Sequence, residues 1–139
     1  MKKYFLLVVT MLTITISGFA ITVPKAVSDA FAKKFPGATN VKWDKENANE
    51  YEAEFKLNGK SGSANFLTDG SWVETEMEIP ANELPAPVAS TVKTKYPAAT
   101  ITKAYKVESA KAGVTYEAEI KNGNKKQEVN MKADGSIVK

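Results

Sequence analysis

The sequence predicts an α+β fold of two tandem helix-plus-four-strand antiparallel repeats, with the helices on one face of a shared or adjacent sheet and the other face open. Three observations predict it. The chain contains an internal duplication. Each copy opens with apolar residues at helical spacing and continues with two-residue alternation, broken by Asn-Gly and Asp-Gly pairs that are typical of turns.

A leader precedes the first copy. Lys2 and Lys3 are followed by an apolar run over residues 4–16 and by small residues up to Ala20, a pattern typical of a secretory signal. The run is shorter than the roughly 20 residues that a membrane-spanning helix needs, and no cysteine follows it to carry a lipid. We therefore expect a signal peptide over residues 1–20, cut after Ala20, and a periplasmic or secreted product without a stable membrane anchor.

The duplication is ordered along the chain. Eight residues of the first copy (Val23, Pro24, Val27, Phe31, Phe35, Pro36, Ala38 and Thr39) match Leu84, Pro85, Val88, Val92, Tyr96, Pro97, Ala99 and Thr100, 61 positions later. The segments 51–54 and 69–71 recur 65 positions later, so the second copy has four additional residues, which we place near 109–113. The repeats are expected over 21–80 and 81–139, together forming one composite domain, because a single copy buries too little surface to be stable.

Each copy begins with a predicted helix. Pro24 suits a first turn, and Val27, Phe31 and Phe35 share one face at a spacing of four. The helix must end near Pro36, because the proline ring removes a backbone donor and restricts the residue before it. The second copy repeats this pattern up to Pro97.

Alternation of apolar and polar residues then predicts short strands joined by turns, which form an antiparallel meander covered by the helix. The expected strands span residues 39–46, 50–57, 61–68, 71–79, 99–108, 114–121, 125–132 and 135–139.

Composition excludes most catalytic chemistry. The chain has neither cysteine nor histidine, which removes thiolate nucleophiles, the commonest general base and the commonest metal ligands. Without Lys2 and Lys3, 17 lysines face 16 acidic residues, so the formal charge is +1 and nucleic acid is an unexpected partner. No phosphate-binding loop, nucleophile elbow or zinc-protease motif is present. We expect no enzyme, no cofactor and no metal site.

The opening VPKAVSDAFAKKFPGATNVKW, the segments YEAEF, FLTDGSW and YEAEI, and the final MKADGS resemble the PepSY-like, beta-lactamase-inhibitor-like family of small exported bacterial proteins. The resemblance covers nearly the whole mature chain. It implies a topology similar to that of beta-lactamase inhibitory protein, with an open sheet face, and by analogy a protein target.

Trp72 is the first candidate for partner binding. Strict alternation in residues 70–79 places Trp72, Glu74 and Glu76 on the face turned away from the helices, where tryptophan often supplies binding energy. A bulge would instead return Trp72 to the core, and burial is the favoured alternative because large aromatic side chains are usually buried.

Two pairs of glutamates complete the candidate set. Alternation places Glu52 and Glu54 in the first copy, and Glu117 and Glu119 in the second, opposite the apolar face. Solvated strand faces commonly carry such residues, paired with lysines across the strands. Trp43 and Tyr105 are expected in the core.

The leading hypothesis is a non-enzymatic protein-binding module that docks an envelope or secreted protein, as an inhibitor does, through the open sheet face. The alternative is a carrier of a small ligand or a divalent cation that uses the same acidic side chains.

Overall fold

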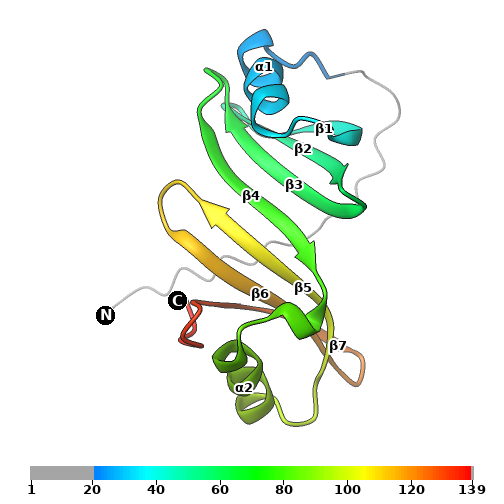
Figure 1. Cartoon of the computed structure of the whole chain (residues 1–139), viewed down its shortest axis with the longest axis vertical. Coiled ribbons are helices and arrows are strands. Elements are labelled where there is room, and N and C mark those ends of the chain that lie inside the picture. Colours follow the sequence, from blue (N-terminus) through cyan, green and yellow to red (C-terminus); the bar gives the residue numbers. More distant parts are fainter. Residues whose placement is uncertain (1–20, 139) are drawn as a thin grey trace.

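The computed structural model describes residues 21–138, so the expected signal peptide and its cleavage position lie outside the described residues. Seven strands form one antiparallel sheet in the order in which they occur along the chain (Figure 1). The elements are α1 (Lys25–Lys34), β1 (Thr39–Asn47), β2 (Glu50–Leu57), β3 (Lys60–Leu67), β4 (Trp72–Ile79), the 3-10 turn η1 (Ala81–Glu83), α2 (Ala86–Lys95), β5 (Thr100–Ser109), β6 (Gly113–Asn122) and β7 (Lys125–Met131).

The sheet continues from one repeat into the other through the pairing of β4 with β5, in which Glu74–Ile79 face Ala104–Ser109. The repeats occupy opposite ends of the molecule, with α1 at one end and α2 at the other (Figure 1). The α+β class and the open antiparallel sheet predicted from the duplication are confirmed.

The prolines define the helix boundaries as expected. Pro24 and Pro85 directly precede α1 and α2. The fixed φ angle of proline suits the entry into a helix. At the other end, the N–H groups of Phe35 and Tyr96 still donate to the carbonyls of Phe31 and Val92. The following Pro36 and Pro97 then stop each helix.

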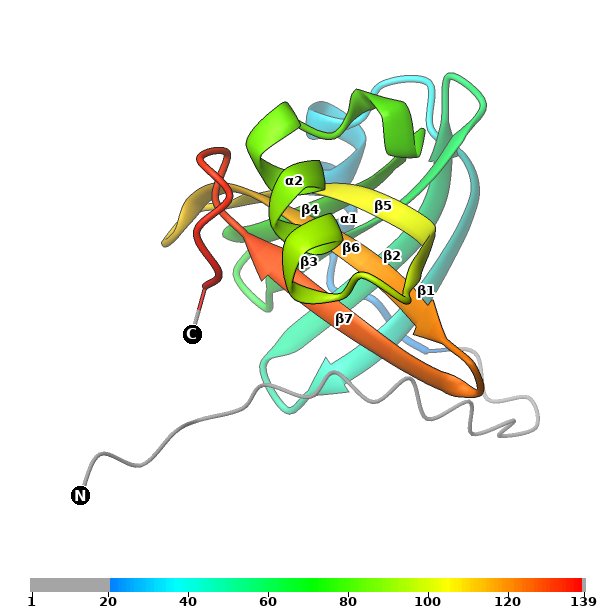
Figure 2. The same cartoon turned by 90° about the horizontal axis from the view of Figure 1, so that it is seen from below.

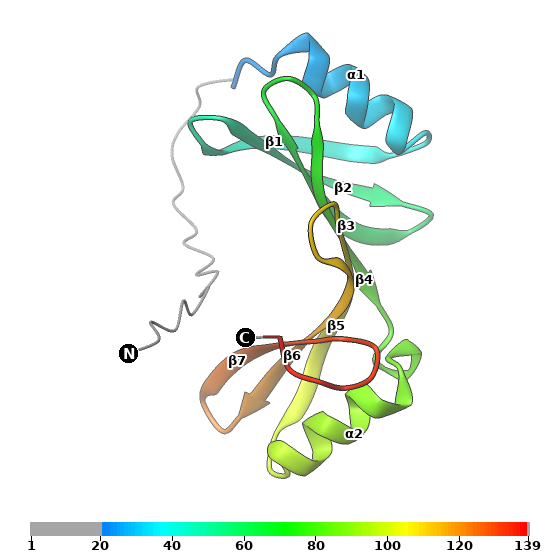
Figure 3. The ribbon, with the colours of Figure 1, turned by 90° about the vertical axis from the view of Figure 1, so that its left-hand side faces the viewer.

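Both helices cover the same face of the sheet. On β4, Thr75 and Met77 face the α1 side, and Ile79, which shares their face, packs against the core of the second repeat. Ile79 is paired with Ala104, a buried residue beneath α2. Figure 3 shows the sheet curving between the helices, which lie on its outer side, and Figure 2 shows α2 lying across β5, β6 and β7. The face without helices is therefore concave.

Each helix buries its apolar stripe in a separate core. The first core is aromatic: Phe31 lies 5.3 Å from Trp43 and 5.2 Å from Phe55 between ring centroids, in edge-to-face geometry. The second is aliphatic and includes Val88, Val92, Ile120, Val129 and Met131. The prediction that Trp43 belongs to the core is confirmed.

The second repeat contributes three strands, because the expected eighth strand over 135–139 is reduced to a single bridge between Met131 and Ile137. Gly135, at φ +82°, turns the chain back against α2, and only Ile137 reaches the pairing position. The four additional residues lie in the β5–β6 hairpin: Trp43 pairs with Ala53, ten residues on, whereas Ala104 pairs with Ala118.

Candidate functional site

The concave face, opposite the helices, brings together the six glutamates selected from the sequence. Ala53, Thr75 and Ala118 are buried beneath the helices, so their neighbours on each strand point the other way. The six are Glu52 and Glu54 on β2, Glu74 and Glu76 on β4, and Glu117 and Glu119 on β6. We call this side of the sheet the acidic face.

Trp72 does not lie on the acidic face. The register between β3 and β4 shifts: Asn65 pairs with Glu74, but Phe66 pairs with Trp72, which leaves Val73 as a bulge. Trp72 therefore shares the side of Phe66 and packs, half-buried, against the first core. Its Nε1 donates a hydrogen bond to Thr75 Oγ1 at 2.9 Å. Strict alternation was wrong here, and the bulge alternative is confirmed.

Tyr105 was expected in the core but lies half-buried on the acidic face, where it pairs with Glu78 on β4 and Glu117 on β6. Its neighbour Ala104 is the residue that faces α2. The duplication contained this information, because Ala104 corresponds to the core residue Trp43 at the offset of 61. Alternation within residues 99–108 alone did not show which side of this strand faces the helix, so the position of Tyr105 was predicted wrongly.

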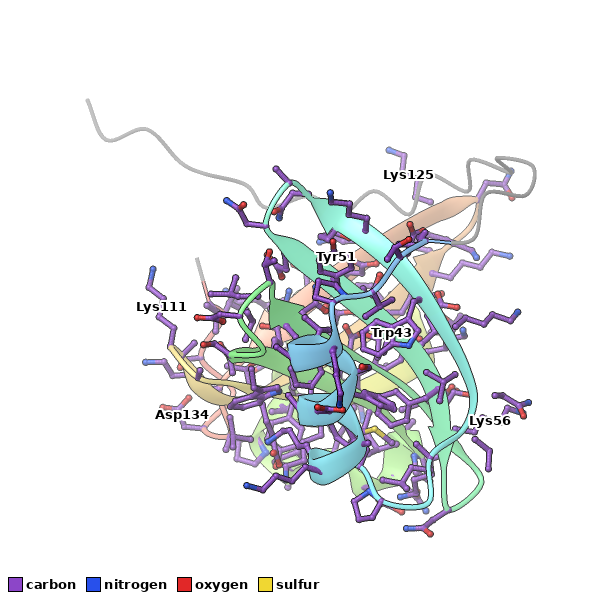
Figure 4. The ribbon with its side chains drawn as sticks, turned by 90° about the horizontal axis from the view of Figure 1, so that it is seen from above. Trp43, Tyr51, Lys56, Lys111, Lys125 and Asp134 are labelled. Carbon is purple, nitrogen blue, oxygen red and sulfur yellow. The ribbon has the colours of Figure 1, made fainter. Side chains whose placement is uncertain are left out.

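Charge is unevenly distributed over the sheet. By strand register, ten acidic side chains lie on the acidic face against five lysines. Figure 4 shows Lys56 and Lys125 at the periphery of the molecule, and Lys111 at the tip of the β5–β6 hairpin. The acids are Asp44, Glu50, Glu52, Glu54, Glu74, Glu76, Glu78, Glu117, Glu119 and Glu128; the lysines are Lys42, Lys56, Lys103, Lys121 and Lys126. A nearly neutral chain thus has one strongly negative face.

Two glutamates at the centre of this face have strongly raised pKa values. Burial, followed by the negative charge of Glu117, raises the pKa of Glu76 to about 8. Burial, followed by the charge of Glu128, raises the pKa of Glu117 to about 7. Glu76 belongs to the first repeat and Glu117 to the second, on the two strands that flank β5, so the central carboxyl groups of this face come from both repeats.

The surrounding carboxylates share this environment. Burial is the main cause that raises the pKa of Glu52, Glu74 and Glu128, with like-charged neighbours second in each case. Glu119 and Glu128 face each other directly across β6 and β7, an arrangement that destabilises a sheet. The fold therefore holds carboxyl groups close together at an energetic cost to their charged forms, and near pH 7 most Glu76 side chains carry a proton.

That cost predicts the pH dependence of folding. Because the folded state raises the pKa of Glu76 from 4.5 to about 8, it binds this proton more tightly than the unfolded chain does. The free energy of unfolding should therefore fall as the pH rises from about 4.5 to 8. We expect Glu76→Gln to increase it by about 2 kcal/mol at pH 8.5, a value reduced for partial solvent screening, and to leave it nearly unchanged at pH 4.5.

Urea unfolding followed by circular dichroism at the two pH values measures this effect. Glu54→Gln is the matched control, because Glu54 is exposed on the same face and pairs with Lys42. The free energy of unfolding of the Glu54→Gln variant should not exceed that of the parent chain at pH 8.5. An equal gain for both variants would contradict the role of burial at Glu76.

The chemistry available on this face is ionic. Within residues 21–138, no group of three acidic side chains is placed to hold a metal ion. In the same part of the chain, no helix is long and apolar enough to cross a membrane. What the face offers is a broad negative concavity with a tyrosine at its centre.

Comparison with known proteins identifies the family. A family model described as "Putative beta-lactamase-inhibitor-like, PepSY-like" matches residues 19–60 and 49–139. No curated protein matches the chain. The two matches overlap and together span all the described residues.

Solved structures share the fold at low sequence identity. A putative periplasmic protein from Bacteroides eggerthii superposes with a TM-score of 0.78 at 20% identity, covering 86% of this chain and 88% of that one. A BLIP-like protein from Bacteroides fragilis gives a TM-score of 0.73 at 22% identity over 86% of both chains. A DUF2874 family protein from Bacteroides ovatus gives 0.75 at 23% identity, covering 86% and 87%. By its family match over both repeats, the chain belongs to the PepSY-like, beta-lactamase-inhibitor-like family.

Proposed function

We propose that this protein is a non-enzymatic binding module of the bacterial envelope, which docks a partner protein through its acidic face in the manner of an inhibitor. The observation that carries the proposal is the concave placement of half-buried glutamates from both repeats, centred on Glu76 and Glu117. A basic partner would stabilise the charged forms of these carboxyl groups, which burial and like-charged neighbours disfavour in the free protein, so the face is suited to a partner of opposite charge.

The expected partner surface is basic and convex. Ten acidic side chains against five lysines favour a protruding loop that carries lysine or arginine. Tyr105, half-buried among these carboxylates, supplies an aromatic contact of the kind that is enriched at interfaces. The periplasmic description of the Bacteroides eggerthii structure and the expected signal peptide support a partner in the envelope.

Photocrosslinking in living cells tests this proposal. A photoreactive amino acid at Ser63, which pairs with Glu54 and Glu76 on the acidic face, should yield a discrete adduct. The same probe at Ser90, exposed on α2 of the opposite face, is the matched control and should yield none. The purified pair should dissociate more readily as salt increases, and Glu74→Gln with Glu117→Gln should weaken it by about tenfold.

Two outcomes would overturn the proposal. One is an adduct formed equally well from Ser90, which would place the contact on the helix side. The other is an interaction that is insensitive both to salt and to the two glutamine substitutions.

A further inference from the structure

A cleft opens on the helix side of the sheet, in the strip over β4 and β5 that lies between the two helices. It has a volume of about 350 Å³, at the small end of the range for small-molecule sites. Its walls come from the end of α1, the end of β2 and the paired strands β4 and β5. The lining residues are Lys34, Phe35, Leu57, Thr75, Met77, Lys106 and Glu108.

The apolar floor depends on a glycine. Met77 on β4 pairs with Gly62 on β3, and a Cβ at Gly62 would lie 2.3 Å from Met77 Sδ. The missing side chain lets Met77 lie across β3 towards Phe35 and Leu57. A flexible thioether at this position can adapt to the shape of a ligand.

The polar groups of the cleft favour an anion. Lys34 Nζ lies 3.9 Å from the centroid of the Trp72 ring, and within residues 21–138 no carboxylate forms an ion pair with Lys34. On the opposite wall Lys106 Nζ lies 2.6 Å from Glu108 Oε1. Two lysines against one glutamate leave an excess positive charge at the rim. Thr75, only 5% exposed, uses its oxygen to accept from Trp72, so its O–H remains available as a donor.

The second repeat does not reproduce these walls. At the corresponding offsets, Phe35, Leu57 and Gly62 are replaced by Tyr96, Asn122 and Gln127. Gln127 Nε2 donates to Tyr96 Oη at 3.2 Å, so a polar contact stands where the first repeat has an apolar opening. The apolar part of the cleft is therefore specific to the first repeat, and Lys106 and Glu108 on β5 complete the cleft from the second repeat.

We propose that this cleft binds a small amphipathic carboxylate, in the chemical class of a free medium-chain fatty acid. The hydrocarbon tail lies on Phe35, Leu57 and Met77. The carboxylate lies between the ammonium groups of Lys34 and Lys106 and accepts a hydrogen bond from the hydroxyl group of Thr75. The cleft lies on the opposite face from the acidic face, so this binding does not rest on the proposed docking function.

Isothermal titration of the exported chain with sodium octanoate tests the proposal. We expect a dissociation constant of about 1 mM or tighter for a ligand of this size. Octylamine, with the same tail and the opposite charge, should bind at least tenfold more weakly. Lys34→Gln should weaken octanoate binding by about tenfold through the loss of a charge-assisted hydrogen bond, and Lys34→Arg should retain most of it.

Lys33→Gln is the matched control, because Lys33 is the neighbouring lysine of α1 and does not line the cleft. It should bind octanoate as the parent chain does. Amide chemical shifts, recorded in the parent chain, should move at Thr75 and Met77 and stay fixed at Val129. Absence of octanoate binding at 10 times the expected dissociation constant, equal binding of octylamine, or equal effects of the two glutamine variants would overturn the proposal.

Discussion

Replacing Phe31 with alanine should lower the free energy of unfolding by about 4 kcal/mol, the largest loss that we expect from any single substitution. Phe31 is 6% exposed, and its ring lies within 6.3 Å, between centroids, of Phe35, Trp43, Phe55 and Phe66. Truncation removes the central ring of this cluster, and the β-sheet beneath it cannot collapse to fill the space. Urea unfolding at pH 7 measures the loss.

The duplication supplies the control. Val92 occupies the corresponding position of α2, is 3% exposed and packs in the aliphatic core. Val92→Ala should cost about 2 kcal/mol, because it removes fewer buried carbon atoms. Should Phe31→Ala cost no more than Val92→Ala, the aromatic cluster would not be the main source of stability in the first repeat.

The same duplication explains why the fold was predictable. Helix ends depend on the residues immediately around them. In both copies prolines specify where the helix begins and ends, Pro24 and Pro36 in the first and Pro85 and Pro97 in the second. Strand faces follow from alternation, so the glutamates at 52, 54, 117 and 119 were assigned to their face correctly. Where a pattern is local and occurs twice, the sequence is sufficient.

Register shifts were not predictable in this way. The side of the sheet on which Trp72 lies depends on whether Val73 forms a bulge. The packing of Trp72 with Phe66 in the first core, and the hydrogen bond from Trp72 Nε1 to Thr75, favour the bulge. Packing of this kind exists only in the folded chain. The corresponding residue of the second copy, the apolar Ile137, was the one available signal.

The charge of the acidic face was hidden for a different reason. Net charge sums over the whole chain, and the lysines of α1 and α2 cancel the carboxylates on the other side of the sheet. The raised pKa values of Glu76 and Glu117 depend on burial and on like-charged neighbours, and the two residues are neighbours because β4 and β6 both pair with β5. Alternation predicts which face a side chain occupies, but not how near the carboxylates of different strands will lie.

The two Asp-Gly turns anchor each helix to its sheet, and replacing Gly70 with alanine should lower the free energy of unfolding by about 3 kcal/mol. Gly70 has φ +87°, and a Cβ there would lie 2.6 Å from the carbonyl oxygen of Ala26 in the first turn of α1. Left-handed backbone strain contributes about 1 kcal/mol of this loss, and overlap with a backbone atom that cannot move aside contributes the remainder. Urea unfolding provides the measurement.

Gly59→Ala separates these two contributions. Gly59 also has a positive φ, +79°, but a Cβ there would meet nothing within 4 Å, so its loss should be about 1 kcal/mol. Gly135 repeats the geometry of Gly70 against the carbonyl of Pro87, at 2.5 Å, and Gly135→Ala should therefore behave as Gly70→Ala does. Equal losses at Gly59 and Gly70 would show that the turn needs only a left-handed backbone. A larger loss at both Gly70 and Gly135 would show that close contact between the turn and the helix holds each helix against the outer side of the sheet. The acidic face, on the other side, then stays uncovered.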